Sequence, residues 1–220
     1  MDCCSPEELK AKDNFFTSRA KKYSRQFRKK GLNAEQKYLV AGIVDTFNNG
    51  TNFSPRSVLE IGCGVAGLLI TLLNKGASFA TGIDASQGMI EKAKENILHL
   101  QLNNKTEFLH GDFVSIESAV SRSEVVILDR VLCCDSNPEL LISKSALKAE
   151  KIYAVSFPRD SFPVRIYVKT GIAIAKLFPV KFLPFYHEPS LLHRWIEEQG
   201  FALKYSRNTF LWQVMVYLRR

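Results

Sequence analysis

Three glycines with the spacing G-x-G-x-x-G, namely Gly62, Gly64 and Gly67, directly follow a predicted strand at residues 57–61 and precede a predicted helix. Glycines in this context permit a tight turn and let a nucleotide-like ligand approach the backbone closely. Further along, Asp84 ends the next predicted strand, where a carboxylate can accept hydrogen bonds from both hydroxyls of a ribose. The two features predict an adenosine cofactor, and by themselves they allow both NAD(P) and S-adenosylmethionine.

Three further features favour S-adenosylmethionine. Glu60 places a carboxylate at the mouth of the glycine turn, where it would repel a pyrophosphate and attract the ammonium group of a methionine. Gly111, Asp112 and Phe113 follow the third predicted strand, so that the acid can accept a hydrogen bond from an adenine amino group beside an apolar side chain. Two strands close together at residues 202–218 demand an antiparallel hairpin at the end of the chain.

The elements that must position these residues alternate between strand and helix from Pro55 onward, and the strand expected from Glu124 to Leu128 contains the unbroken apolar run Val125 to Leu128, which is typical of a strand buried on both faces. Such alternation predicts an α/β protein with a parallel sheet and helices on both faces. Strands are expected at residues 57–61, 79–83, 106–109, 124–128 and 151–157, and helices after the glycine turn to about residue 75, from the capping Ser86 to about Leu102, from Pro138 to about 147, and from near Pro189.

In these features the chain resembles the class I S-adenosylmethionine-dependent methyltransferases over roughly residues 55–220. The resemblance implies a Rossmann-like sheet of seven strands whose last strand is antiparallel. It also implies a site made of Glu60, Gly62, Gly64 and Gly67 at the methionine end, Asp84 and Ala85 at the ribose, Met89, Gly111, Asp112 and Phe113 at the adenine, and Leu128, Asp129 and Arg130 beside the transferring methyl group.

The acceptor is less clearly indicated. Enzymes that methylate amino groups of DNA bases or of protein glutamine resemble one another in an Asn/Asp-Pro-Pro-aromatic motif after the fourth strand, and this chain has residues 128–134, LDRVLCC, there instead. Residues 165–188 are similar to part of the magnesium-protoporphyrin methyltransferases, which esterify a porphyrin propionate. A closer likeness, in Cys3-Cys4, residues 129–134 and residues 158–160, is to uncharacterised bacterial methyltransferases grouped with magnesium-protoporphyrin O-methyltransferase. We therefore expect a small, apolar, anionic acceptor that is methylated on oxygen.

Candidate catalytic residues depend on that acceptor. His187, with Glu188 adjacent, could serve as a general base, because an imidazole can accept a proton at neutral pH, or it could make a structural hydrogen bond at a helix start. A carboxylate acceptor needs no base, and then Arg130 and Arg159 would bind its carboxylates as bidentate forks. In both cases Asp129 and Arg130 would lie beside the reacting atoms.

The charge divides unevenly along the chain, with a net charge of +4 over residues 1–50, −3 over residues 51–150 and +7 over residues 151–220. We expect residues 1–50 to be an N-terminal helical extension with a basic first helix, residues 6–30. The core, residues 51–220, would contain an insertion at about residues 158–187 that includes a cap helix at 161–178, and the two additions would form a lid. Basic flanks also leave open two alternatives: an RNA methyltransferase, or a non-catalytic S-adenosylmethionine-binding or membrane-surface module with residues 161–178 on an anionic membrane.

The five cysteines are expected to be free thiols in a reducing compartment, because four of them are adjacent pairs and the spacings typical of a zinc site are absent. We expect no metal site and no obligate protein partner. The chain has no apolar run of about 18 residues and no basic region followed by an apolar core at its start, so a cytoplasmic location is expected.

Overall fold

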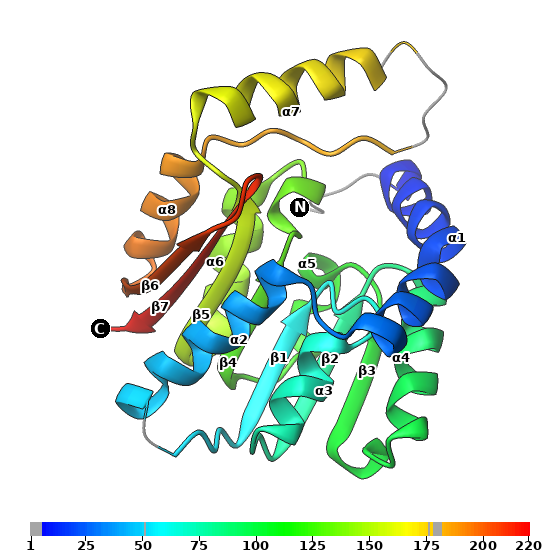
Figure 1. Cartoon of the computed structure of the whole chain (residues 1–220), viewed down its shortest axis with the longest axis vertical. Helices are drawn as coiled ribbons and strands as arrows, with labels where there is room; N and C mark the ends of the chain where they lie inside the picture. The colour runs from blue at the N-terminus through cyan, green and yellow to red at the C-terminus, as the bar shows by residue number, and fades with distance from the viewer. Residues whose placement is uncertain (1–5, 51, 176, 178–181) are drawn as a thin grey trace.

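The structure is a computed structural model that describes residues 6–50, 52–175, 177 and 182–220. Its centre is a seven-stranded sheet with the order β3-β2-β1-β4-β5-β7-β6, in which β7 runs antiparallel to both of its neighbours (Figure 1). The strands are β1 (Ser57–Ile61), β2 (Phe79–Asp84), β3 (Thr106–His110), β4 (Ser123–Asp129), β5 (Ala149–Pro158), β6 (Phe201–Asn208) and β7 (Trp212–Arg219). The sheet expected from the resemblance is therefore confirmed.

Helices cover both faces of the sheet, as predicted, because its central strands are apolar on both sides. Every residue of β4 is buried. One face packs against α2 (Ala34–Thr46), α3 (Gly67–Asn74) and α4 (Gln87–His99), and the other against α5 (Phe113–Ile116), α6 (Pro138–Lys148) and α8 (Pro189–Glu198). Four short 3-10 helices complete the connections: η1 (Phe47–Gly50), η2 (Asn103–Lys105), η3 (Glu117–Ala119) and η4 (Leu132–Cys134).

The ends of α4 illustrate how the sequence sets helix boundaries. Ser86 caps its start as predicted, with the hydroxyl accepting a hydrogen bond from the Met89 amide. The helix ends at His99, earlier than the predicted end near Leu102, because Gln101 adopts the left-handed conformation (φ 56°) that closes the last turn.

The long N-terminal helix α1 (Pro6–Lys30) docks on the start of α4 through side chains that satisfy backbone groups there. The amide of Gln87 donates to the Asp13 carboxylate, and the amide of Gly88 donates to the Thr17 hydroxyl at 3.0 Å. The Thr17 hydroxyl also shares a hydrogen bond with the hydroxyl of Ser86. Helix α1 thus satisfies amides that α4 itself leaves unpaired at its first turn.

A second pair of hydrogen bonds anchors the middle of α1. The buried Ser24 hydroxyl donates to the Asn96 side-chain oxygen, and the Asn96 amide group donates to the carbonyl of Val65 in the glycine turn. Helix α1 is therefore tied both to α4 and to the loop after β1.

Helix α7 (Phe162–Ala175) lies outside both helical layers, across the end of the sheet toward which β1 and β4 point (Figure 1). The cap helix was predicted at 161–178, and residues 176 and 178 lie outside the described part of the chain. No helix in the described part has both the length and the apolar character needed to cross a bilayer.

Gly88→Ala should detach α1 from α4. A Cβ at Gly88 would lie 2.7 Å from Thr17 Cγ2 and 3.0 Å from Thr17 Cα, so that the backbone of α1 must move. We expect a loss of ~1–3 kcal/mol in the free energy of unfolding and faster amide hydrogen exchange across residues 6–30. Gly171→Ala on α7, where a Cβ meets nothing within 4 Å, is the matched control and should leave both measurements unchanged or raise stability slightly. Equal effects of the two substitutions would contradict this account of the docking.

Candidate functional site

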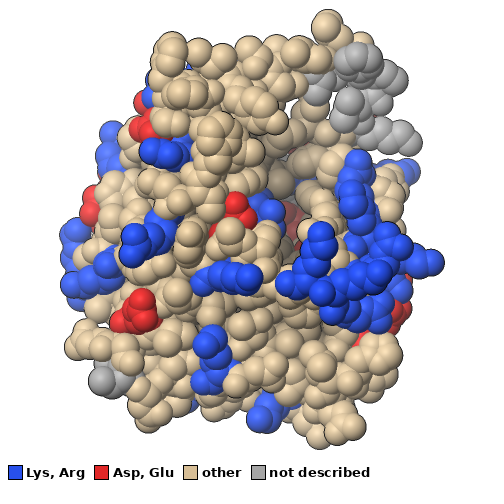
Figure 2. Space-filling model, viewed as in Figure 1, with Lys and Arg blue, Asp and Glu red and all other residues tan. Residues whose placement is uncertain are grey.

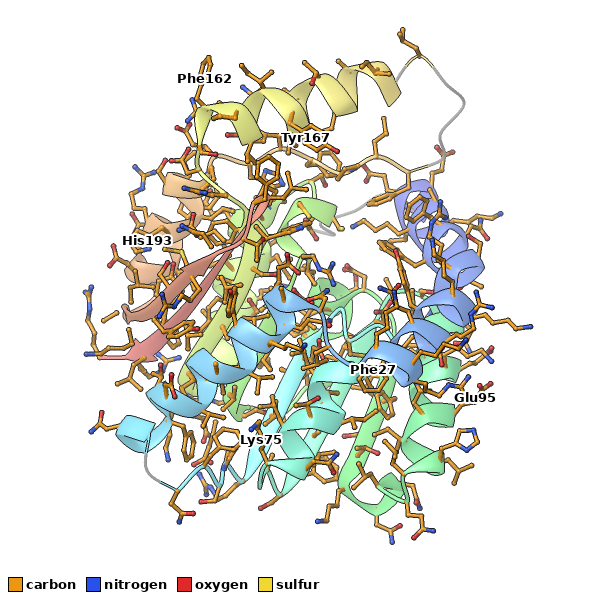
Figure 3. The ribbon with its side chains drawn as sticks, viewed as in Figure 1. Phe27, Lys75, Glu95, Phe162, Tyr167 and His193 are labelled. Carbon is orange, nitrogen blue, oxygen red and sulfur yellow. The ribbon has the colours of Figure 1, made fainter. Side chains whose placement is uncertain are left out.

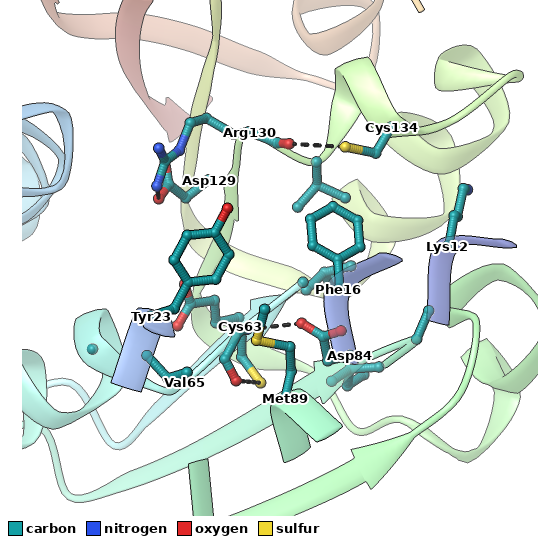
Figure 4. Close-up of a pocket in the computed structure, with 18 of the residues that line it drawn as sticks. Lys12, Phe16, Tyr23, Cys63, Val65, Asp84, Met89, Asp129, Arg130 and Cys134 are labelled. Carbon is teal, nitrogen blue, oxygen red and sulfur yellow. Dashed lines mark hydrogen bonds and ion pairs between the residues drawn. The ribbon is translucent and has the colours of Figure 1, made fainter. Parts of the chain in front are cut away.

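A cavity of about 500 Å³ opens at the carboxyl ends of the central strands, beneath α1 (Figure 4). Twelve of the residues expected at the site line it: Glu60, Gly62, Gly64, Gly67, Asp84, Ala85, Met89, Gly111, Asp112, Phe113, Asp129 and Arg130. These residues lie at the carboxyl ends of adjacent parallel strands or in the loops and helix starts that follow them, which explains why they meet.

The glycine turn after β1 brings the backbone close to its neighbours. Gly62 has a φ of 70°, and a Cβ there would lie 2.4 Å from Val131 Cγ2. The amides of Gly62 and Cys63 both donate to the carbonyl of Ile83, which joins the turn to the end of β2. Only glycine satisfies both the left-handed conformation and the lack of space at position 62.

Glu60 is the most unusual group in the cavity, because it is buried and its Oε2 atom has no hydrogen-bond partner within the protein. Burial raises the pKa of its carboxyl group well above the ordinary value, and the negative charges of Asp129 and Asp84 raise that pKa further. A buried carboxylate oxygen without a partner needs a donor or a cation from outside the chain.

Asp84, at the end of β2, is held in place by the backbone. Its two oxygens accept hydrogen bonds from the amides of Gly64 and Ser86, each at 2.8 Å. Burial raises its pKa to about 6, although these two amides oppose the shift. Each oxygen keeps a second lone pair, so the carboxylate can accept further hydrogen bonds from a ligand in the cavity.

The other predicted ligand-binding acid, Asp112, caps α5 by accepting hydrogen bonds from the Ser115 amide and hydroxyl. Gly111 precedes it with a φ of 153°, and its amide donates to the carbonyl of Asp84. Phe113 is buried beside them and lines the same part of the cavity. A helix cap and a ligand contact are compatible uses of the two Asp112 oxygens.

After β4, Asp129 holds Arg130 at the cavity wall. One Asp129 oxygen accepts from the Ser156 hydroxyl, and the other accepts from the Gln36 side-chain amide at 3.1 Å and from Arg130 Nη2 at 3.3 Å. The Arg130 guanidinium carbon lies 5.6 Å from the centre of the Trp212 ring. Asp129 is thus engaged by three donors, whereas Arg130 gives only one of its five N–H donors to a side chain among the described residues, so the others can reach a ligand.

Two predicted site residues do not line the cavity. Leu128 is fully buried, and its side chain packs among apolar residues of β5 and α6, because side chains alternate along β4 and Asp129 takes the cavity side. His187 bonds through Nε2 to the carbonyl of Asp135 at 2.8 Å and stacks near Phe185. Burial lowers the pKa of His187. The hydrogen bond to Asp135 matches the structural alternative expected from the sequence, and the role of His187 as a general base stays a prediction.

The two parts of the expected lid lie differently with respect to the cavity, and lid closure itself stays a prediction. Helix α1 roofs the cavity with Lys12, Phe16 and Tyr23, and Figure 4 shows the Tyr23 hydroxyl directed toward Asp129 and Arg130. None of the described residues of α7 lines the cavity, and neither does Arg159. The chain after α7 supplies Phe182 and Pro184 instead.

Sequence reasoning expected α1 near the site but named none of its lining residues, such as Phe15, Phe16 and Tyr23, and it missed Gln36 of α2 and Trp212 of β7 altogether. The aromatic stripe on the first helix was a usable signal, because aromatic residues on a basic helix need a partner surface. Nothing local indicated Gln36 or Trp212. Among the described residues, no three His, Cys, Asp or Glu side chains are grouped so that they could hold a metal ion.

Comparison with known proteins gives the family. A family model described as a methyltransferase domain matches residues 53–199, which is more than half of the chain. The chain belongs to this methyltransferase family. The resemblance recognised in the sequence is thereby confirmed.

Relatives of this methyltransferase share modest identity with it. The chain is 30% identical over 142 residues to a release factor glutamine methyltransferase of Caulobacter vibrioides, covering 56% of the chain and 49% of that protein. It is 27% identical over 155 residues to a ubiquinone biosynthesis O-methyltransferase of Coxiella burnetii, covering 67% and 64%. The matches therefore span about half to two thirds of the length of these curated relatives.

Among solved structures, the fold is similar to a magnesium protoporphyrin IX methyltransferase from Synechocystis crystallised with S-adenosylhomocysteine. The TM-score is 0.73 at 21% identity, and the superposition covers 95% of this chain and 98% of that one. At this identity the likeness shows the fold.

Glu60→Gln should abolish proton release on binding of S-adenosylmethionine. A ligand ammonium beside Glu60 favours the carboxylate, so the raised pKa of the free protein must fall on binding and a proton must leave. Calorimetric titration at pH 7 in two buffers of different ionisation enthalpy measures this release, and at that pH Asp84, with a pKa of about 6, is already mostly ionised. For the unmodified protein, affinity should rise with pH until Glu60 is ionised in the free state. Proton release that survives in Glu60→Gln would assign it to another group.

Asp84→Ala should weaken binding of S-adenosylmethionine at least about tenfold, because a charged acceptor loses hydrogen bonds worth ~1.5–3 kcal/mol each. Asp84→Asn keeps one acceptor oxygen, so its affinity for S-adenosylmethionine should lie between those of the unmodified protein and of Asp84→Ala. Since Asp84 also holds the amides of Gly64 and Ser86, thermal unfolding of each variant must accompany the titration. Unchanged affinity in a folded Asp84→Ala variant would show that the ribose lies elsewhere.

Proposed function

We propose that this protein transfers a methyl group from S-adenosylmethionine to an oxygen of a small acceptor that has an apolar body and an acidic group. The observation that carries the proposal is the division of one cavity into a wall of unsatisfied or backbone-held acids, Glu60 and Asp84, and a wall of aromatic side chains beside Arg130. The acidic wall suits the cofactor, and the aromatic wall beside Arg130 suits the acceptor.

The residues present fit S-adenosylmethionine. The unpartnered Oε2 atom of Glu60 would receive the methionine ammonium, Asp84 would accept from the ribose hydroxyls, and Met89 and Phe113 would enclose the adenine. When bound, this cofactor supplies an electrophilic methyl group on a positively charged sulfur. A pyrophosphate would face two buried acids, which argues against a dinucleotide in the same place.

For the acceptor, the chain provides an apolar pocket and the guanidinium of Arg130. Phe15, Phe16 and Phe182 pack together at the roof with ring centroids 5.1–5.7 Å apart. Arg130 would bind a carboxylate of the acceptor, and Asp129 would fix the direction of that guanidinium. In a cavity closed to water, such positioning of an oxygen toward the methyl group can contribute ~7–11 kcal/mol to catalysis.

An acceptor that arrives already ionised fits best, because His187 is not among the residues that line the cavity and Asp129 is engaged by three donors. No base has to remove a proton from a carboxylate. The names of two similar proteins, a ubiquinone biosynthesis O-methyltransferase and a magnesium protoporphyrin IX methyltransferase, agree with an oxygen acceptor on an apolar body.

RNA methylation is the second candidate, and the outer face of α1 favours it. Lys21, Lys22, Arg25, Lys29 and Lys30 are exposed there, and Figure 2 shows basic side chains gathered over this helix. RNA binding of this kind must weaken steeply as salt rises, because phosphate contacts release counterions. Retention on RNA that does not respond to salt would exclude this candidate.

Arg130→Gln should raise the KM for a carboxylated aromatic acceptor by ~10–100-fold, since one or two charge-assisted hydrogen bonds are lost. The dissociation constant for S-adenosylmethionine should change little. Arg159→Gln is the matched control, because Arg159 does not line the cavity, and His187→Ala should leave turnover of a carboxylate nearly unchanged. Product analysis by mass spectrometry completes the test, and methylation on nitrogen would contradict the choice of oxygen.

A further inference from the structure

Helix α7 has an inner face that covers the body of the protein. Val164, Val168 and Ile172 recur every four residues and point inward, with Val164 buried and the other two partly buried. This stripe accounts for how α7 is attached.

The opposite face of α7 is apolar too, but nothing in the described structure covers it. The exposed fractions are 74% for Phe162, 47% for Ile166 and 58% for Ile174, and Leu177 just beyond the helix is 82% exposed. Figure 3 shows Phe162 directed away from the sheet. A helix that is apolar on both faces is expected to be covered on both, so this face calls for an apolar partner.

The exposed apolar surface continues beyond α7. The amide of Arg159, just before the helix, donates to the carbonyl of Leu211 in the turn between β6 and β7. That turn carries Phe210, which is also largely exposed. The apolar surface therefore involves two separate segments at the same end of the molecule.

The charge of this region identifies what kind of partner fits. Residues 161–187 contain four lysines and arginines and no aspartate or glutamate. Of these, Lys169 is exposed, with Nζ 4.9 Å from the centre of the Tyr186 ring, and Arg165 is paired with Asp160 at the helix start. In Figure 2 the ridge formed by α7 is almost free of charged side chains of either sign. A second copy of this chain would bring like charges together, whereas a surface with anionic headgroups above an apolar layer satisfies both Lys169 and the apolar face.

We propose that α7 is an interfacial helix that lies in the headgroup layer of an anionic membrane, with Phe162, Ile166 and Ile174 inserted. Its 14 residues extend only about 21 Å, which is too short to span the ~30 Å apolar layer of a bilayer, so the helix lies along the surface.

The position of α7 connects the membrane surface to the cavity. The chain that returns from α7 supplies Phe182, whose ring centroid lies 5.3 Å from that of Phe15 and 5.7 Å from that of Phe16 at the cavity roof. If the proposed function is correct, an apolar acceptor dissolved in the bilayer could enter beside this aromatic cluster. Membrane binding itself does not rest on the identity of the acceptor.

Sedimentation with lipid vesicles tests the proposal without any methylation assay. The full chain should bind vesicles that contain phosphatidylglycerol and phosphatidylcholine, and should bind pure phosphatidylcholine more weakly. Ile166→Glu and Ile174→Glu should each lower the partition coefficient on anionic vesicles at least about tenfold, because each removes an inserted apolar side chain and adds a repelled charge. Leu98→Glu on α4, where the leucine is 67% exposed, is the matched control and should bind like the unmodified protein.

Lys169→Glu should weaken binding to anionic vesicles and leave the residual binding to phosphatidylcholine unchanged. Affinity for S-adenosylmethionine should be the same in all these variants, which shows that they are folded and separates this proposal from the proposed function. Failure of the unmodified protein to bind either kind of vesicle would overturn the proposal. A dimer in solution that Ile166→Glu and Ile174→Glu dissociate would overturn it as well, by assigning the apolar face to a second copy.

Discussion

Three carboxylates meet at one edge of the sheet, because Glu60, Asp84 and Asp129 belong to the carboxyl ends of the adjacent strands β1, β2 and β4. Like charges buried so close together must each be compensated. Asp129 is compensated by Arg130, Ser156 and Gln36, and Asp84 by two backbone amides, while Glu60 has an oxygen with no partner in the protein. Because Glu60 is the one of these three acids that has an oxygen without a partner, a cationic ligand belongs beside Glu60.

The surrounding elements serve this acidic edge. The loop after β1 can approach it because of Gly62, and α1 closes it from above while using Asp13 and Thr17 to hold the start of α4. Aromatic side chains from α1 and from the segment after α7 then make the remaining wall apolar. The cavity therefore has one acidic side and one apolar side.

The parallel core and most of the acidic edge could be predicted from sequence, because buried strands such as Glu124 to Leu128 carry a local apolar signal and the acids follow directly from strand ends. Leu128 and His187 could not be placed. The placement of Leu128 depends on which face of β4 is directed toward the cavity. The placement of His187 depends on whether its ring nitrogen bonds to a backbone carbonyl 52 residues away in the sequence. Gln36 and Trp212 were missed for the same reason, since only tertiary packing brings α2 and β7 to the loop after β4. We expected α7 to cover the cavity, but none of its described residues lines it. The amphipathic pattern of a helix alone does not say which surface the helix packs against.

The anchoring of α1 has a consequence for how the molecule assembles. Its hydrogen bonds to α4 and to the capping Ser86 join residues 69 to 74 positions apart in the chain. During synthesis, therefore, the first helix emerges well before the helix on which it docks, and Phe15 and Phe16 meet Phe182 only when most of the chain has been made. Docking of α1 must follow formation of the β1-to-α4 unit. An element that is held by a few side-chain hydrogen bonds is also among the first to open, which makes the ligand site accessible without unfolding of the sheet.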